Sequence, residues 1–245
     1  MQKIEIKEKK IKYSIITVTY NAASTLEETI LSVIKQRNIN YEYIIIDGGS
    51  KDSTIDIIKK YQDRIYYWIS EKDKGIYDAM NKGLKIASGD FVIFLGADDH
   101  FLSYNTLEMT SKYINNIDEV YYGTVFRSKR NDLYYGKFNK YLISLENICH
   151  QTIFYPKCIY KKYEYNLNFN VYADYFYNLT LFPHYKFNYI PLTISYYTYD
   201  GYSSKVKDDN FHYIVDEYVK KELGYSCFIL RKIYKFYKYI KSKKV

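Results

Sequence analysis

The first hundred residues alternate between short apolar runs and longer segments with helical periodicity. The apolar runs are rich in β-branched residues and span 13–18, 42–47, 65–69 and 91–95. Near-continuous apolar strands of this kind are typical of parallel sheets that helices cover on both faces. This alternation constrains the fold more than any other feature. It predicts an α/β protein with a mostly parallel sheet.

The segments between the apolar runs carry the signals of amphipathic helices. Ser24 and Glu27 have the spacing of a capping box, which predicts the start of the first helix. The third helix is expected over 76–87 and ends at Gly89. The apolar stripes of the three helices are Leu26, Ile30, Val33 and Ile34; Ile55, Ile58 and Tyr61; and Ile76, Met80, Leu84 and Ala87.

Polar residues follow three of the predicted strands at their carboxyl ends, where parallel α/β sheets bind ligands. They are residues 19–21, residues 47–50, and the adjacent carboxylates Asp98 and Asp99. Two carboxylates at the end of a buried strand either hold a divalent cation that bridges a diphosphate, or cap the turn into a helix. The convergence of three loops, in a chain without a glycine-rich phosphate loop, favours a nucleoside-diphosphate site.

The pattern changes after residue 104 and becomes helical again from about 208. We therefore expect three parts, a first half over 12–103, a second half over 104–207 and a helical basic tail over 208–245. No linker rich in Pro or Gly separates the halves, so the second is expected to pack on the first. Strand-like runs in the second half span 119–126, 134–138, 152–156 and 187–199.

Composition and charge exclude several classes of protein. The chain is 47% hydrophobic and 26% charged, as globular proteins are, and no apolar stretch is long enough to span a bilayer. Residues 1–12 lack the apolar core of a secretory signal. Three cysteines in no metal-ligand spacing favour a reduced, cytoplasmic compartment. The net charge of +8 is concentrated at the chain ends, which argues against a nucleic-acid groove through the body.

An ordered series of motifs closely resembles the family 2 glycosyltransferases with the GT-A fold. That resemblance implies a Rossmann-like, mostly parallel sheet flanked by helices, with a C-terminal helical extension here. Within the family, the chain most resembles bacterial enzymes that build capsule, exopolysaccharide or O-antigen. The motifs cover about residues 12–205 and read "SIITVTYNAASTLEETILSVIKQ", "YIIIDGGSKDST", "SEKDKGIYDAMNKGLKIASGDFVIFLGADD", "CHQTIFYP" and "ADY".

The resemblance implies transfer of a sugar from a nucleotide-diphosphate donor with inversion at the anomeric carbon. It makes 12–103 the nucleotide-sugar-binding half and 104–207 the acceptor-binding and catalytic half. Asp99 would hold Mn²⁺ or Mg²⁺, and Asp98 would face the ribose and contribute to the metal site. Asp174, in "FNVYADYFYNL", matches the family's general base, which takes the proton of the acceptor hydroxyl. The structural alternative for Asp174 is an acid at a helix N-terminus, stabilised by the helix dipole.

Further positions match the family's donor site. Relatives often have a second acid after the position of Asp47, which bonds the uracil ring, whereas this chain has Gly48. Many also have Arg at the position of Met80. Asp47 could instead cap its turn, Thr17 and Thr19 could be ordinary strand residues, and 76–87 could be an ordinary helix. The donor-site matches are Thr17, Thr19, Tyr20, Asn21, Asp47, Asp73, Gly75, Asp78, Asn81 and Asp98.

Two more elements match positions near the acceptor or the diphosphate. His150 and Gln151 form the family's "HQ" pair, although a lone histidine is often structural. The "GYSS" stretch with Ser203 resembles a "GGxS" segment that closes over the site, with Tyr202 in place of the second glycine.

The tail carries seven Lys or Arg residues and no acid over 225–245. A basic amphipathic helix with an aromatic-rich face predicts binding to a membrane surface, on the inner face of the cell membrane. The alternative is a helix whose apolar stripe docks on the domain and whose lysines face water. The apolar stripe is Ile229, Ile233, Phe236, Tyr237 and Ile240.

The hypothesis from sequence is a metal-dependent inverting glycosyltransferase, peripheral to the membrane. Its donor would be a UDP-sugar, since UDP is the commonest nucleotide in such enzymes, and its acceptor a glycan or a polyprenyl-diphosphate-linked sugar. A sugar-nucleotide pyrophosphorylase would need a Gly-rich phosphate loop near 17–30, and none is present. A degenerate binding module that keeps affinity for nucleotide-sugar or glycan without turnover is the remaining alternative.

Overall fold

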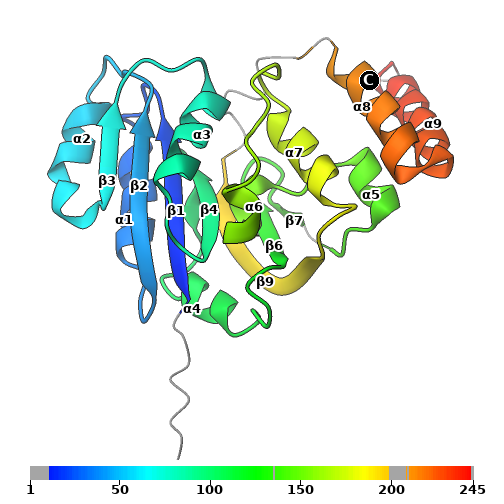
Figure 1. The fold of residues 1–245 in the computed structure, drawn as a ribbon. Helices are drawn as coiled ribbons and strands as arrows, with labels where there is room; N and C mark the ends of the chain where they lie inside the picture. The colour runs from blue at the N-terminus through cyan, green and yellow to red at the C-terminus, as the bar shows by residue number, and fades with distance from the viewer. Residues whose placement is uncertain (1–10, 135, 199–207, 209, 244–245) are drawn as a thin grey trace, which may run out of the picture.

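The computed structural model describes residues 11–134, 136–198, 208 and 210–243. In this part of the chain one sheet of nine strands crosses the molecule, with the strand order β3-β2-β1-β4-β8-β6-β9-β5 and β7 paired to β6 (Figure 1). The strands are β1 Lys12–Thr19, β2 Asn40–Asp47, β3 Tyr67–Ser70, β4 Phe91–Gly96, β5 His100–Phe101, β6 Val120–Arg127, β7 Asp132–Tyr134, β8 Ile153–Pro156 and β9 Phe187–Tyr197.

Helices connect these strands and form the C-terminal part of the fold. The α-helices are α1 Leu26–Ile34, α2 Thr54–Lys60, α3 Ile76–Ile86, α4 Thr106–Ser111, α5 Lys140–Leu145, α6 Lys157–Tyr160, α7 Ala173–Leu181, α8 Phe211–Tyr218 and α9 Tyr225–Ser242. Two 3₁₀ turns lie at Gln62–Arg64 and His150–Thr152, and a π-helical turn at Val219–Leu223 joins α8 to α9.

The first four strands form the parallel half of the sheet. β1 pairs in parallel with β2 and with β4, and β2 pairs in parallel with β3. The register sets Thr19 opposite Asp47 and Asp47 opposite Ser70. The carboxyl ends of these strands therefore meet at one edge, as the sequence pattern predicts. β8 joins the two halves because it runs antiparallel to both β4 and β6.

Alternate residues of the strands fill two separate cores. Ile15, Tyr43 and Ile93 pack under α1, α2 and α4 on one face. Ile16, Ile44 and other side chains of the opposite parity pack under α3 and against α6, α7 and α8 on the other face. Burial on both faces explains why the strands lack polar alternation.

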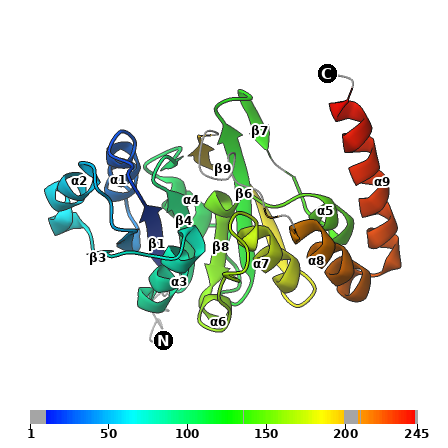
Figure 2. The same cartoon turned by 90° about the horizontal axis from the view of Figure 1, so that it is seen from above.

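α9 lies along the edge of the molecule, on the side away from α1 and α2 (Figure 2). The face that docks on the body contains Cys227 and Arg231, which are both buried. Within the described residues, no helix has both the length and the apolar character needed to cross a membrane.

Three local predictions need correction. Thr25 precedes α1 without a side-chain cap. Glu27 accepts hydrogen bonds from Lys60, the last residue of α2, and from the following Tyr61, and does not close a box with Ser24. The third strand runs over Tyr67–Ser70, two residues later than its apolar run. The strand expected over 134–138 ends at Tyr134, because it pairs with β6 through Asp132 to Tyr134.

Candidate active site

The loops after β1 and β2 are joined by hydrogen bonds at the carboxyl edge of the sheet. Asn21 has a left-handed backbone conformation (φ 49°), and its side-chain oxygen accepts the N–H of Lys51 at 2.8 Å. The N–H of Asn21 donates to Ser50 Oγ at 2.8 Å, and the N–H of Gly48 donates to the carbonyl of Thr19 at 2.9 Å. These contacts hold the two loops as one rigid surface.

Asp47 organises this surface from within. Its side chain is fully buried, and one oxygen accepts the N–H groups of Gly49 and Ser50 and the hydroxyl of Ser70, at 2.6–3.0 Å. The other oxygen accepts the hydroxyl of Ser50 at 2.5 Å. These four donors give Asp47 the contacts of a turn cap, and its role toward the donor stays a prediction.

Asp98 and Asp99 stand at the end of β4, as the sequence predicts. Asp99 is 2% exposed and accepts hydrogen bonds from Gln151 (2.9 Å), the N–H of Gly96 (3.2 Å) and the N–H of Thr198 (3.2 Å). Burial, together with the charge of Asp98, raises the pKa of Asp99 to about 7. Burial also raises the pKa of Asp98, which is the more exposed of the two. Among the described residues no Lys or Arg forms an ion pair with either carboxylate, and burial outweighs the positive charge of His150, which acts to lower both pKa values.

The 3₁₀ turn at His150–Thr152 links this carboxylate pair to Asp174 at the start of α7. Gln151 donates to Asp99, while Nδ1 of the adjacent His150 lies 3.3 Å from Asp174 Oδ2. Burial acts to lower the pKa of His150. The hydrogen bond to Asp174 and the negative charges of Asp174, Asp99 and Asp98 outweigh burial, so that the pKa of His150 is raised.

Two further side chains orient Asp174. The amide of Asn147 donates to Asp174 Oδ2 at 2.8 Å, and the hydroxyl of Tyr77 lies 3.0 Å from Oδ1. The single hydroxyl proton of Tyr77 is shared with the carbonyl of Val171, which is also within hydrogen-bonding distance. Asp174 is thus more than a dipole-stabilised helix acid, because side chains from three other segments hold its carboxylate.

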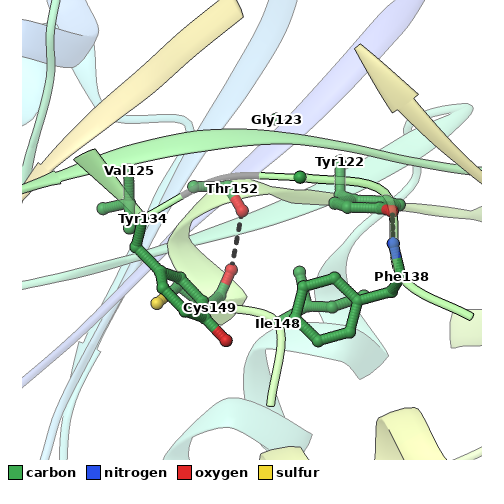
Figure 3. A pocket seen from close by; sticks show the side chains of 9 residues that line it. Tyr122, Gly123, Val125, Tyr134, Phe138, Ile148, Cys149 and Thr152 are labelled. Carbon is green, nitrogen blue, oxygen red and sulfur yellow. Dashed lines mark hydrogen bonds between the residues drawn. The ribbon is translucent and has the colours of Figure 1, made fainter. Parts of the chain in front are cut away.

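Two cavities lie near these groups. A cleft of about 410 Å³ opens beside Asp98. The cleft is large enough for part of a sugar nucleotide. Its other lining residues are Thr25, Glu28, Thr29, His100, Tyr196 and Thr198. The second cavity, next to Cys149 and Thr152, holds only about 10 Å³ (Figure 3). It has room for one water at most, so it is too small to bind a substrate.

Comparison with known proteins identifies the family. A family model described as glycosyl transferase family 2 matches residues 14–182. The chain belongs to glycosyl transferase family 2. It is 32% identical over 209 residues to a PGL/p-HBAD biosynthesis glycosyltransferase of Mycobacterium bovis, covering 81% of this chain and 82% of that protein. It is also 40% identical over 89 residues to the putative teichuronic acid biosynthesis glycosyltransferase TuaG of Bacillus subtilis, covering 35% of each chain.

Solved structures of the GT-A type share the fold. TarS 1–349 of S. aureus in complex with UDP superposes with a TM-score of 0.69 at 18% identity, covering 86% of this chain and 66% of that one. The mannosyltransferase PcManGT of Pyrobaculum calidifontis, in complex with GDP-Man and Mn²⁺, superposes with a TM-score of 0.60 at 16% identity, covering 87% and 62%. The predicted family and the α/β GT-A fold are confirmed.

The family's acidic pair fits a divalent cation by its donor atoms. Mg²⁺ and Mn²⁺ prefer carboxylate oxygens, and burial raises the pKa values of Asp98 and Asp99 despite the nearby charge of His150. Among the described residues, no cluster of three or more His, Cys, Asp or Glu side chains could enclose a metal. Further ligands would therefore come from a diphosphate and from water.

The remaining predicted donor residues fall into two groups. Thr19 is 5% exposed, and its Oγ1 has no hydrogen-bond partner in the described part of the chain, while Tyr20 is 63% exposed beside it. Asp73 and Gly75 lie in the loop before α3, where Asp73 accepts the N–H of Gly75 at 2.9 Å. Gly75 is the N-cap of α3 and has a positive φ of 115°. These residues stay at the carboxyl edge of the sheet.

The others have partners inside the fold. Thr17 is fully buried and accepts the hydroxyl of Tyr43 at 3.1 Å, which is the strand role left open by the sequence. Asn81 also turns inward, because its amide makes both of its hydrogen bonds with the backbone of Tyr165, at 2.8 and 2.9 Å. Asp78 accepts the N–H of Lys74 at 3.0 Å and so stabilises the start of α3. Ser203 lies outside the described residues.

Sequence reasoning missed Tyr77, Asn147 and Thr198. Tyr77 lies next to the apolar stripe of α3, where an aromatic residue reads as core. Asn147 precedes the "HQ" pair by three residues and was a usable signal, since buried carboxylates need donors. Thr198 directly follows β9, and its hydroxyl donates to the carbonyl of Asp98 at 2.8 Å.

Proposed function

We propose that this protein is an inverting glycosyltransferase that transfers a sugar from a nucleotide-diphosphate donor, with Asp174 as the general base. The observation that carries the proposal is the linkage through His150 and Gln151. These neighbours contact Asp174 and Asp99 respectively, so the proposed base and the proposed diphosphate-binding carboxylate lie on either side of one turn. An inverting transfer needs such an arrangement, because the acceptor attacks the anomeric carbon opposite the leaving diphosphate.

In this reaction Asp174 takes the proton of the acceptor hydroxyl as its oxygen bonds to the anomeric carbon. The bond from that carbon to the diphosphate oxygen breaks, and its electron pair leaves with the nucleoside diphosphate. Asn147 and Tyr77 hold the carboxylate of Asp174 in position. A single displacement of this kind inverts the configuration at the anomeric carbon.

Asp99 and Asp98 are the proposed holders of Mn²⁺ or Mg²⁺. When bound, the cation would neutralise charge on the leaving diphosphate. Asp98 lies beside the open cleft and has room to face the ribose as well. Gln151 and Thr198 would keep Asp99 in place by their hydrogen bonds.

The proposed donor is a UDP-sugar and the proposed acceptor is a glycan or a polyprenyl-diphosphate-linked sugar in bacterial surface polysaccharide synthesis, such as capsule, exopolysaccharide or O-antigen. The names of the relatives support a glycan-building role, and the TarS structures with UDP and UDP-GlcNAc support a nucleotide-sugar donor. The PcManGT structure contains GDP-Man, so an experiment must decide between uridine and guanosine nucleotides.

We further propose a location on the cytoplasmic face of the cell membrane, through α9. The stripe of Ile229, Ile233, Phe236, Tyr237 and Ile240 is 41–65% exposed. At about 100° per residue it lies opposite the docked face of Cys227 and Arg231. Lys241 and Lys243 are exposed and flank the stripe, one on each side. An apolar face between cations suits the interface of an anionic membrane, where each lysine contributes about 1 kcal/mol.

Vesicle co-sedimentation tests this location. We expect binding to vesicles of phosphatidylcholine with phosphatidylglycerol, weaker binding to phosphatidylcholine alone, and loss of binding in Ile233→Ser/Phe236→Ser. The matched control is Leu102→Ser/Ile117→Ser, since these residues are similarly exposed, at 49% and 47%, on other elements. Equal binding by both double variants would exclude α9 as the membrane-binding surface.

The first test of the enzymatic function is a thermal-shift panel of UDP, GDP, dTDP, CMP and ADP, each with and without Mn²⁺. A ligand that binds only the folded state raises the melting temperature in proportion to the logarithm of its concentration over its dissociation constant. We expect one diphosphate to stabilise the protein only with metal, and Asp99→Asn to lose that effect. No stabilisation by any nucleotide would refute the role of the acidic pair.

A catalytically degenerate binding module would pass that first test, so a second one is needed. Asp174→Asn should retain nucleotide binding and abolish sugar transfer. Release of the nucleoside diphosphate measures both transfer and hydrolysis. If the wild-type protein binds nucleotide-sugar and neither transfers nor hydrolyses it with any acceptor tried, the binding-module alternative is favoured.

A further inference from the structure

The segment that leads into α7, the helix of Asp174, is held by a carboxylate from a distant part of the chain. Asp208 accepts three consecutive backbone N–H groups, those of Asn170 (2.7 Å), Val171 (2.9 Å) and Tyr172 (3.2 Å). Tyr172 is the N-cap of α7, and its own side chain makes no cap hydrogen bond. Asp208 therefore supplies a contact that the sequence next to α7 does not provide.

The hydrogen bonds of Asp208 are of the strong, charge-assisted kind. Burial acts to raise the pKa of this half-buried carboxyl, but the N–H groups of residues 170–172 outweigh burial and lower the pKa. The side chain is thus ionised at neutral pH. Val171 is only 5% exposed, so its N–H depends on an acceptor from the protein.

The same segment contacts a side chain that orients Asp174. The carbonyl of Val171 accepts the hydroxyl of Tyr77, and that hydroxyl lies 3.0 Å from Asp174 Oδ1. Val171 is therefore held by Asp208 through its N–H and by Tyr77 through its carbonyl. A shift of residues 170–172 would move the carbonyl that shares the proton of Tyr77, and would change the contact between Tyr77 and Asp174.

The start of α8 fixes Asp208 against this segment. The N–H of Phe211 donates to the carbonyl of Asp208 at 3.2 Å. Phe211 is 1% exposed, and its ring centre lies 4.5 Å from that of Tyr172 and 5.7 Å from that of Tyr175. Packing on both sides of the residues before α7 therefore gives the carboxylate of Asp208 a defined place.

We propose that Asp208 is a positioning residue for the general base, and that it acts on the carboxylate of Asp174 through Val171 and Tyr77. This inference rests on the proposed function, in which Asp174 is the base. The contacts of Asp208 are with the backbone, so its removal should slow the chemical step and leave the binding of nucleotide unchanged. A residue that served only overall stability would not separate these two quantities.

Turnover of the full-length protein with Mn²⁺ can be measured as release of nucleoside diphosphate, with water as the acceptor. The donors are UDP-GlcNAc, UDP-glucose, UDP-galactose and GDP-mannose, and Asp174→Asn gives the background. On the most active donor, we expect Asp208→Ala to lower kcat roughly 10- to 100-fold, the range for a misplaced catalytic group. The dissociation constant of the nucleoside diphosphate, measured by calorimetry, should not change. Asp208→Asn keeps one acceptor oxygen and should lose less activity.

The matched control is Asn139→Ala. The side chain of Asn139 also accepts consecutive backbone N–H groups at the start of a helix, those of Tyr141 and Leu142 in α5, at 3.0 and 2.9 Å. Its removal should lower the melting temperature and leave kcat at the wild-type value.

A double-mutant cycle with Tyr77→Phe tests the path of the effect. If both residues act on Asp174 through Val171, Tyr77→Phe/Asp208→Ala should lose little more activity than Asp208→Ala alone. Losses that multiply would show that the two residues act independently, which would refute the path. Circular dichroism establishes that each variant is folded, and Asp208→Asn replaces Asp208→Ala in the cycle where the alanine variant does not fold.

The two levels of the proposal fail differently. If folded Asp208 variants keep the wild-type kcat, or lower it no more than Asn139→Ala does, the role of Asp208 is refuted and the glycosyltransferase proposal stands. Weaker nucleotide binding at an unchanged kcat would refute it as well. If the wild type turns over no donor above the background of Asp174→Asn, both proposals are refuted.

Discussion

The contact that holds α9 on the body of the protein yields a quantitative prediction. Arg231 is 3% exposed, and its Nε donates to Asp216 Oδ1 at 2.7 Å. Its Nη1 also donates to the carbonyl of Ser144 and, at 3.2 Å, to the hydroxyl of Tyr175. This buried contact determines which face of α9 is turned away from the protein.

The two partners of this ion pair should differ in importance. Arg231→Met leaves Asp216 paired with Lys232 and Lys235, at 2.7 and 2.6 Å, so the loss is limited to the hydrogen bonds of Arg231. We expect a cost of about 2–3 kcal/mol. Asp216→Asn leaves a buried guanidinium without its counter-ion, which costs about 3–5 kcal/mol. The acid should therefore matter more than the base.

Urea unfolding followed by circular dichroism measures both free energies, and limited trypsin digestion reports local opening of α9. Lys221→Met is the control, since its ion pair with Glu222 (3.2 Å) is solvent-exposed and is worth less than about 1 kcal/mol. If Arg231→Met costs more than Asp216→Asn, or if neither exceeds the control, the reasoning about this buried charge is wrong.

Three further predictions concern the site and its support. Tyr77→Phe, which removes a hydrogen bond to Asp174, should lower kcat roughly tenfold with little change in nucleotide affinity, as steady-state kinetics and titration can establish. Asn81→Ala should destabilise the protein by about 1–3 kcal/mol in urea unfolding, because it leaves buried backbone groups of Tyr165 unpaired, and it should leave the dissociation constant of the nucleotide unchanged. Burial acts to raise the pKa of Glu42, but hydrogen bonds from Lys12 and two serines outweigh it and lower the pKa to about 2. This stability is present above the unfolded-state pKa and lost as pH falls from about 4.5 toward 2, so Glu42→Gln should flatten the acid limb of a melting-temperature profile.

The fold was predictable because its signals are local. Burial on both faces makes the strands apolar throughout, and the helices show their inner stripes at a period that one segment displays by itself. The carboxyl ends of parallel strands share an edge by geometry, so Thr19, Asp47 and Asp98 were expected together before any contact was known. The third helix, expected over 76–87, runs over Ile76–Ile86, and the C-terminal helices, expected from about 208, begin at Phe211. The exceptions, such as the capping box at Ser24, occurred where a tertiary partner competed for the side chain.

The site was predictable in outline and not in its pairings. The motifs pointed to Asp174, His150 and Asp99, and the structure joins these residues through one turn. Which polar side chain faces the site and which turns into the core depends on contacts between residues far apart in the chain. Asn81 bonds a backbone 84 residues away, and Tyr77 reaches Asp174 over 97 residues. Residue type alone does not distinguish a polar side chain that faces the site from one that turns into the core.

The same division applies to α9. Its sequence by itself determined an amphipathic, basic helix, because periodicity and charge are properties of one segment. Only the tertiary structure decided that the apolar stripe faces away from the protein, since a single buried arginine on the opposite face finds its counter-ion on α8. A buried charge must be paired, and that requirement outweighs the burial of a partly apolar face.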